Sequence, residues 1–208
     1  MRIQYCSDLH LELSQNSKYF ETTPLSVAGD ILILAGDIVP LHDEYLTNPF
    51  FSYVSSHYKQ VYWIPGNHEF YHKNISDYST SYNIRIFENI NIVNNIELQY
   101  AGIRFIFSTL WSKITLGNEK NIERNVSDFE FISRNNKKFN AATFNKLHDE
   151  SLGFIKHSLN SKWDKTVVVT HHLPSVLCNS DVHNASSINE AFCVDLTGYI
   201  KECNANFW

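Results

Sequence analysis

Short apolar runs that end in polar side chains recur along this sequence. Residues 31–34 form an uninterrupted aliphatic run, and Ala35, Gly36 and Asp37 follow it directly. A strand that is buried on both faces has this pattern. A carboxylate behind such a strand lies at the carboxyl edge of a sheet, where open α/β sheets bind ligands. Asp37 is therefore either a solvated turn residue or a ligand that points into a crevice.

Three further runs have the character of strands and end in similar chemistry. Their side chains alternate between apolar and polar, or are largely aliphatic and β-branched. If these strands are parallel neighbours of residues 31–34, the polar side chains behind them converge on one edge of the sheet. The runs and the residues behind them are 1–6 with Asp8 and His10, 60–64 with Asn67 and His68, and 165–170 with His171 and His172.

The remaining pattern predicts helices and one hairpin around these strands. Apolar residues at helical spacing indicate helices over residues 43–59, where Pro49 limits the start, and over 139–159 and 188–203. Alternation around a Gly-containing turn indicates a hairpin of residues 96–100 and 103–109. We expect a polar loop over 14–23, a surface helix with a short strand near 90–93 within 72–95, and a long loop or helix–loop excursion over 111–136. The predicted fold class is α/β, in a single domain spanning residues 1–208.

Composition limits the partners and the cellular compartment that we expect for this domain. The formal net charge of -5 argues against a broad basic surface for nucleic acid, so that partner is not expected. No signal peptide is visible, and no apolar run has the roughly 18 residues of a membrane span. Four scattered cysteines are typical of free thiols in a reducing compartment. We therefore expect a cytoplasmic protein that does not associate with membranes.

The residue types at the strand ends suit a metal centre. In an extended segment residues i and i+2 project the same way, so Asp8 and His10 can bind one cation together. Oxygen and imidazole donors without thiolate favour Mn, Fe, Zn or Mg. A central carboxylate such as Asp37 can bridge two cations about 3.5 to 4 Å apart.

The ordered motifs at the strand ends resemble those of the calcineurin-like metallophosphoesterase family. They are Asp8-x-His10, Gly36-Asp37, Gly66-Asn67-His68-Glu69 and Thr170-His171-His172. The resemblance implies a two-sheet α/β/β/α sandwich. It also implies hydrolysis of phosphoester bonds by a dinuclear metal centre, whose metal-bound hydroxide attacks a small phosphorylated substrate.

The same resemblance implies a role for each motif residue. His68 would lie near the scissile phosphate and protonate the leaving oxygen or stabilise the transition state. The metal ligands would be Asp8 and His10 for the first ion, Asp37 as the bridge, and Asn67 with one of the two adjacent histidines, preferably His171 rather than His172, for the second.

Two departures from the family pattern change this expectation. The final Gly-His-x-His motif is missing, and the sequence ends at Trp208, where its strand should begin. Each metal ion would then lack one protein ligand, the site would hold either two ions or only one, and the sheet would lack its last strands. His183 is a poor substitute because it lies in a polar loop. Pro40 stands where the protein-phosphatase branch has the Asp that orients the catalytic histidine.

Three functions remain open at this point. The first is a metal-dependent phosphoester hydrolase, with activity in doubt because two ligand histidines are absent. The second is a non-catalytic or vestigial domain of the same fold, and the third is a nuclease of that fold. The sequence is that of either a shortened relative with weak metal binding or a truncated chain.

Overall fold

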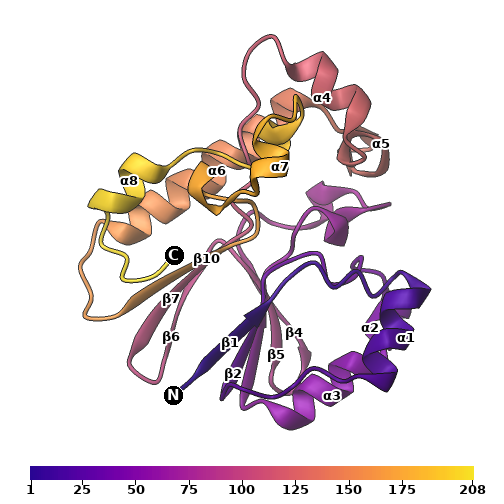
Figure 1. The fold of residues 1–208 in the computed structure, drawn as a ribbon, viewed down its shortest axis with the longest axis vertical. Helices are drawn as coiled ribbons and strands as arrows, with labels where there is room; N and C mark the ends of the chain where they lie inside the picture. The colour runs from indigo at the N-terminus through magenta and orange to yellow at the C-terminus, as the bar shows by residue number, and fades with distance from the viewer.

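The alternating and aliphatic runs form strands that assemble into two main sheets in the computed structural model, which describes residues 1–208 (Figure 1). In order across the first sheet, the strands are β1 (Ile3–Cys6), β2 (Ile31–Leu34), β3 (Gln60–Trp63), β5 (Ile90–Asn94) and β4 (Tyr82–Phe87). The second sheet consists of β10 (Thr166–Thr170), β7 (Ile103–Ser108) and β6 (Ile96–Tyr100). A small hairpin is formed by β8 (Ser133–Arg134) and β9 (Lys137–Lys138).

Strand β2 shows why the sheets stack. Ile31 and Ile33 pack in the layer between the two sheets, together with Phe105 of β7. Leu32 and Leu34 project to the opposite face, where helices cover the first sheet. Because side chains alternate along a strand, one aliphatic run supplies two buried layers. The predicted strand with two buried faces is confirmed.

The predicted adjacency of all four motif-bearing strands is only partly correct. β1, β2 and β3 are parallel neighbours in the first sheet. β10 belongs instead to the second sheet, where it pairs in parallel with β7. The predicted hairpin of β6 and β7 is confirmed and forms the rest of that sheet. The polar residues behind β10 therefore approach the others from a different sheet.

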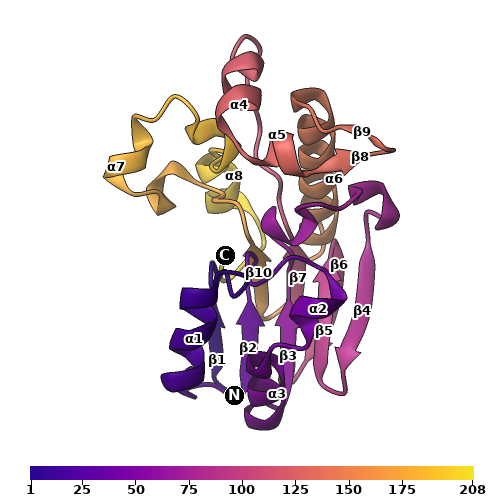
Figure 2. The ribbon, with the colours of Figure 1, turned by 90° about the vertical axis from the view of Figure 1, so that its right-hand side faces the viewer.

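Helices lie on the outer faces of both sheets (Figures 1 and 2). On the first sheet, α3 (Pro49–His57) begins behind Asn48, whose side chain accepts a hydrogen bond from Phe50 N, and buries Phe51. On the second sheet, α6 (Ala141–Leu159) buries Ile155. The other α-helices are α1 (Ser14–Thr22), α2 (Asp43–Leu46), α4 (Glu119–Asn125), α5 (Asp128–Phe131), α7 (Asp181–Asn184) and α8 (Thr197–Glu202). Four 3₁₀ turns cover His68–Phe70, Ile75–Asp77, Val176–Cys178 and Asn189–Ala191.

Three predicted segments are wrong in their secondary structure. Residues 14–22 form α1 instead of a polar loop, because Phe20 packs on Phe50 and gives this polar stretch one apolar contact. Residues 82–87 form β4, which pairs antiparallel with β5, in place of a surface helix. Only residues 197–202 of the predicted last helix are α-helical. The predicted excursion over 111–136 contains α4 and α5.

The last predicted helix fails because its first half pairs with another segment. Val194 N donates to Leu173 O at 3.0 Å, and Leu196 N donates to Pro174 O at 2.8 Å. These hydrogen bonds use donors that a helix would need for its own carbonyls. Tertiary pairing therefore overrides the apolar spacing of this stretch.

The end of the chain lies beside β10. Asn206 N donates to Thr166 O at 2.9 Å, and Phe207 O accepts from Val168 N at 2.9 Å. The absence of the final strands of the family pattern stays a prediction.

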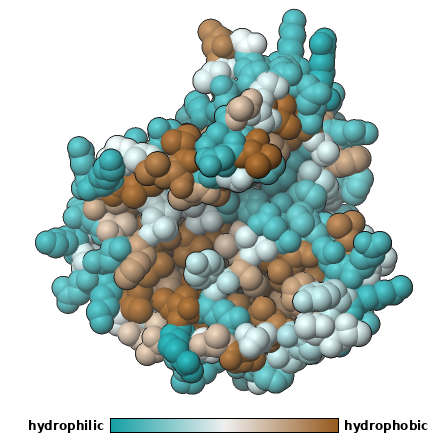
Figure 3. All heavy atoms as spheres, viewed as in Figure 1, coloured by the Kyte–Doolittle hydropathy of each residue, from teal (hydrophilic) through white to brown (hydrophobic).

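Figure 3 shows hydrophobic residues gathered on the face where both sheets are seen. None of the helices has the length and apolar content that a membrane span requires.

Candidate metal centre

The exit loops of β1 and β2 hold each other through their backbones. Asp8 N donates to Gly36 O at 2.9 Å, and His10 N donates to Asp37 O at 3.0 Å. Asp8, His10 and Asp37 have φ angles of 57°, 45° and 56°. Residues other than glycine rarely adopt this left-handed backbone conformation, and those that do are concentrated at functional sites.

The left-handed backbone changes the grouping of the candidate ligands. The prediction that Asp8 and His10 project together from an extended segment is wrong. Each residue instead joins a different cluster of donors from other loops. Within each cluster the ligand atoms lie within 4.8 Å of one another, and the clusters are Asp8 with Asp37 and His171, and His10 with Glu12 and His68.

Asp37 lies between the two clusters and is 5% exposed. Its Oδ1 is 3.5 Å from His171 Nε2. Its Oδ2 is 3.9 Å from His68 Nε2 and 4.0 Å from His10 Nε2. A carboxylate whose two oxygens face different donor sets has the position that a bridging metal ligand requires.

His171 reaches this centre from the second sheet. Its Nδ1 lies 2.9 Å from Ala35 O, and because a carbonyl can only accept, Nδ1 carries the proton. The remaining nitrogen, Nε2, faces Asn67 Oδ1 at 3.2 Å and Asp37 Oδ1. Burial lowers the pKa of His171, but the carboxylates of Asp37 and Glu69 raise it, and the balance lies above the usual value. Acceptors that converge in this way need a proton or a metal cation between them.

Asn67 is oriented by a residue that the sequence analysis missed. Its Nδ2 donates to Asp128 Oδ1 at 2.7 Å, and Tyr71 OH donates to the same oxygen at 2.9 Å. The amide oxygen of Asn67 is thereby left to face His171. Burial raises the pKa of Asp128, while the bonds from Asn67 and Tyr71 counteract part of that rise. Asp128 lies 61 residues away from Asn67 in the chain, and no local pattern marks it.

Glu12 is a second residue that the sequence analysis missed. Its Oε1 lies 3.2 Å from His10 Nδ1 and 3.4 Å from His68 Nδ1. Burial raises the pKa of Glu12, but hydrogen bonds with the two histidines outweigh it and lower the pKa to about 2. The other oxygen, Oε2, is buried without a partner. The signal was present in the sequence as a carboxylate two residues after His10.

A buried carboxylate, Glu69, connects the exit loops of β2 and β3. It accepts hydrogen bonds of 2.7 to 2.9 Å from Asp37 N, Ile38 N, Gly66 N and Trp63 Nε1. Burial and the neighbouring Asp37 raise the pKa of Glu69 to about 7, against the effect of these hydrogen bonds. Glu69 belongs to the Gly66-Asn67-His68-Glu69 motif, but the family resemblance assigned it no role.

Two glycines leave room for the imidazole of His171. Gly36 has a φ angle of 95°, and a Cβ there would overlap the His171 ring. A Cβ at Gly66 would overlap both Asp37 Oδ1 and the same ring. Glycine at these positions permits a contact between the two sheets that any other residue would block.

His172 and His183 lie apart from the centre. His172 is buried, accepts a hydrogen bond from Ser112 N at 2.8 Å, and packs on Trp111 and Phe144. Burial, together with the charge on His171, lowers its pKa well below the usual value. His183 is exposed on α7, as expected of a surface residue. The structure thus brings together Asp8, His10, Asp37, Asn67, His68 and His171, and adds Glu12 to them.

Comparison with known families covers nearly the whole chain. The family described as calcineurin-like phosphoesterase matches residues 1–197. The chain belongs to this family. The resemblance predicted from the motifs is therefore confirmed, and the calcineurin-like phosphoesterases are metal-dependent phosphoester hydrolases.

Two individual proteins are also similar to this chain. "Uncharacterized protein L509" of Acanthamoeba polyphaga mimivirus is 32% identical, over 97% of this chain and 81% of that protein. The crystal structure of phosphopantetheinyl hydrolase (PptH) from Mycobacterium tuberculosis superposes with a TM-score of 0.60. That match has 18% identity and covers 93% of this chain and 76% of the hydrolase, so it supports the fold alone.

Proposed function

We propose that this protein hydrolyses phosphoester bonds of small phosphorylated substrates, using two divalent metal ions held at the strand exits. The observation that carries the proposal is the position of Asp37, whose two oxygens face Nε2 of His171 on one side and Nε2 of His10 and His68 on the other. Membership of the family supports the reaction class.

The residues present fit divalent metal ions. Carboxylate, amide and imidazole donors without thiolate suit Mn, Fe, Zn or Mg. His171 offers Nε2 because Ala35 O holds its Nδ1, and a carbonyl partner of this kind is typical of metal-bound histidines. The buried, unpartnered Oε2 of Glu12 is a further oxygen beside this donor set. The ions would be held by Asp8, His10, Asp37, Asn67 and His171.

Bound ions would polarise the phosphoryl group and lower the pKa of an attacking water. On the other side of the phosphorus, His68 is the residue that transfers a proton. Its Nε2 faces the centre, 3.9 Å from Asp37 Oδ2, while its ring stacks on Tyr71 with centroids 4.1 Å apart. In the proposed reaction Nε2 donates a proton to the leaving oxygen as negative charge develops there.

Glu12 is a positioning residue in this scheme. Because Pro40 provides no carboxylate at the position used by the protein-phosphatase branch, another group must orient His68. Glu12 Oε1 lies 3.4 Å from His68 Nδ1, and an acceptor there fixes the proton on Nδ1 and orients the ring. The formal net charge of -5 favours small substrates over long polyanions.

Metal analysis combined with turnover of an aryl phosphate and an aryl phosphodiester tests the proposal. We expect turnover that requires Mn or a similar divalent ion and falls on the order of 10³-fold in Asp37→Asn, because the ions supply several kcal/mol of transition-state stabilisation. Asp43→Asn is the matched control, since this exposed carboxylate follows β2 but lies outside both donor clusters.

Three other outcomes would contradict the proposal. Bound metal without turnover of either ester would indicate a non-catalytic domain. Fewer than about one ion per chain would exclude two-metal catalysis. Degradation of plasmid DNA in place of small esters would identify a nuclease.

A further inference from the structure

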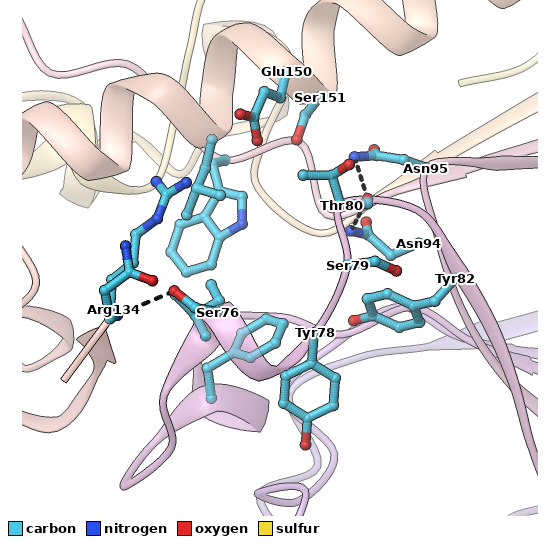
Figure 4. A pocket seen from close by; sticks show the side chains of 15 residues that line it. Ser76, Tyr78, Ser79, Thr80, Tyr82, Asn94, Asn95, Arg134, Glu150 and Ser151 are labelled. Carbon is cyan, nitrogen blue, oxygen red and sulfur yellow. Dashed lines mark hydrogen bonds between the residues drawn. The ribbon is translucent and has the colours of Figure 1, made fainter.

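A cavity of about 280 Å³ lies between the first sheet and α6 (Figure 4). None of the candidate metal ligands lines it. Phe70, from the 3₁₀ turn that also contains His68, forms part of its wall. The cavity is therefore a separate space that shares a turn with the metal centre.

Aromatic side chains form one part of the cavity wall. Phe70 packs on Tyr78 with ring centroids 5.5 Å apart and on Trp111 at 6.1 Å. Ile75 and Leu147 add aliphatic surface. Aromatic walls of this kind favour a flat ring, which can stack or pack edge-to-face on them.

Two polar atoms at the cavity are buried and have no hydrogen-bond partner. They are Oε2 of Glu150, on α6, and the hydroxyl of Tyr82, on β4. The neighbouring amides are already used, because Nδ2 of Asn94 and Nδ2 of Asn95 both donate to Thr80 O. A ligand that donates a hydrogen bond would thus find its acceptor at Glu150.

A guanidinium lies across the cavity from the strand wall. Arg134, at the end of β8, is half-buried and forms no ion pair in the structure. Figure 4 shows its side chain reaching toward the part of the cavity where Glu150 lies. An unpaired guanidinium binds phosphate through paired, charge-assisted hydrogen bonds.

We propose that this cavity binds a nucleoside monophosphate. The base packs against the partly exposed ring of Tyr78 and the edges of Phe70 and Trp111, which are 2% and 3% exposed, as bases do on aromatic side chains elsewhere. An N–H or amino group of the base donates to Glu150, and the phosphate pairs with Arg134. The small volume excludes longer nucleic acid chains. The proposal does not depend on hydrolysis at the metal centre.

Calorimetric titration of the full chain with guanosine, adenosine and cytidine monophosphates tests the site. EDTA is kept in the buffer, and the titration is repeated with Asp37→Asn, so that binding at the metal centre does not contribute. We expect saturable binding that weakens by at least about tenfold in Glu150→Gln and in Arg134→Gln, the loss expected for a charge-assisted hydrogen bond. The second variant keeps the test decisive if the first fails to fold.

Matched controls are available on the same surfaces. Asp149→Asn changes the neighbouring carboxylate on α6, which binds Lys113 and does not line the cavity. Arg124→Gln removes an arginine of α4 that is also outside it. We expect both controls to bind as the unmodified protein does. In a ¹⁵N spectrum the indole signal of Trp111 should shift on binding, while those of Trp63, Trp163 and Trp208 stay in place.

Several results would overturn the proposal. These are absence of saturable binding up to about 1 mM, equal binding of ribose 5-phosphate or of a zwitterionic amino acid, or affinity that is unchanged in both variants. Loss of phosphoester hydrolysis bears only on the metal centre, because these titrations measure binding without metal. Failure of one proposal is therefore distinguishable from failure of the other.

Discussion

The two main sheets are stabilised by buried charged side chains, Glu69 and Arg104, that lie at opposite ends of the strands. Glu69 is 0% exposed and lies behind the exits of β2 and β3 in the first sheet. Arg104 is 1% exposed and lies near the start of β7 in the second sheet, opposite Thr166, the first residue of β10. The exit edge of one sheet and the entry edge of the other are thus each organised around a charge.

The two charges satisfy opposite kinds of backbone group. Glu69 accepts from N–H groups of the turns behind two strands, including Asp37 N and Gly66 N. Arg104 donates to Ser158 O at 2.9 Å and Ser161 O at 3.0 Å, where α6 ends and its carbonyls lack helical donors. A carboxylate therefore fixes the loops that carry the candidate ligands, whereas a guanidinium closes the fold at the far edge. Substitutions at the two positions should have separable consequences.

Replacing Glu69 by Ala should have the largest effect. Four N–H donors lose their acceptor inside the protein. Each buried donor without an acceptor costs about 1 to 3 kcal/mol, so the free energy of unfolding should fall by at least about 4 kcal/mol. Urea denaturation measures this loss. Glu97→Ala is the control on the second sheet, because Glu97 is 39% exposed and its ion pair with Arg104 spans 3.5 Å.

The Glu97 control should lose at most about 1 kcal/mol. In any Glu69→Ala protein that still folds, metal stoichiometry should also drop, because Asp37 loses its backbone anchor. A stable Glu69→Ala protein with full metal content would show that the exit loops do not depend on this carboxylate.

Replacing Arg104 by Met should also destabilise the protein, but without affecting the metal centre. The carbonyls of Ser158 and Ser161 lose a charged donor, so we expect the free energy of unfolding to fall by about 3 kcal/mol. Metal content and turnover per folded molecule should stay at the level of the unmodified protein. A loss of bound metal in this variant would refute the separation between the two edges.

The strand exits of the two sheets could be predicted from the sequence, but the pairing of the strands could not. β2, β3 and β10 are strongly apolar strands with polar residues behind them, and the abrupt end of each apolar run made the strand exits visible. The assignment of His171 to the same sheet as Asp37 failed, because parallel pairing with β7 depends on contacts far along the chain. The family resemblance still placed the two residues together.

Other parts of the site could not be predicted from local pattern. Asp128 and Asn67 meet only after the chain has folded, and their hydrogen bond joins α5 to the exit of β3. Glu12 follows His10 by two residues, but its contact with His68 depends on the left-handed backbone at Asp8 and His10. Turn conformation, which periodicity does not report, therefore determined which donors came together.

Replacing Glu12 by Gln tests a single contact at the exit edge of the first sheet, the one between Glu12 and His68. The amide keeps the size of the side chain but removes the charge beside His68, so we expect kcat to fall by about 10- to 100-fold with KM little changed. Steady-state kinetics on the aryl esters measures the change, with metal stoichiometry as the control. Because Glu12 acts through the histidine, the double variant with His68→Asn should be no slower than His68→Asn alone. Additive losses would mean that Glu12 acts independently of His68.

The smallest predicted effect concerns a titrating group on the side of the second sheet. His148, on α6, is buried, with Nδ1 2.6 Å from Trp111 O. Burial lowers the pKa of His148 below its usual value, although the hydrogen bond to Trp111 O opposes this. The unfolded chain then binds the proton more readily than the folded protein. Stability contributed by the neutral ring is present above the unfolded-state pKa of about 6.5 and is lost as the pH falls below it.

His148→Asn isolates this contribution, because Asn keeps a donor near the position of Nδ1 and does not titrate. Urea unfolding of both proteins between about pH 7.5 and pH 5, on either side of the unfolded-state pKa, should show the unmodified protein losing stability more steeply than the variant. Other titrating groups, including His172, are common to both proteins and cancel in the difference. Parallel pH profiles would show that His148 ionises in the folded protein as easily as in the unfolded chain, and that the acid sensitivity originates instead at the exit edge.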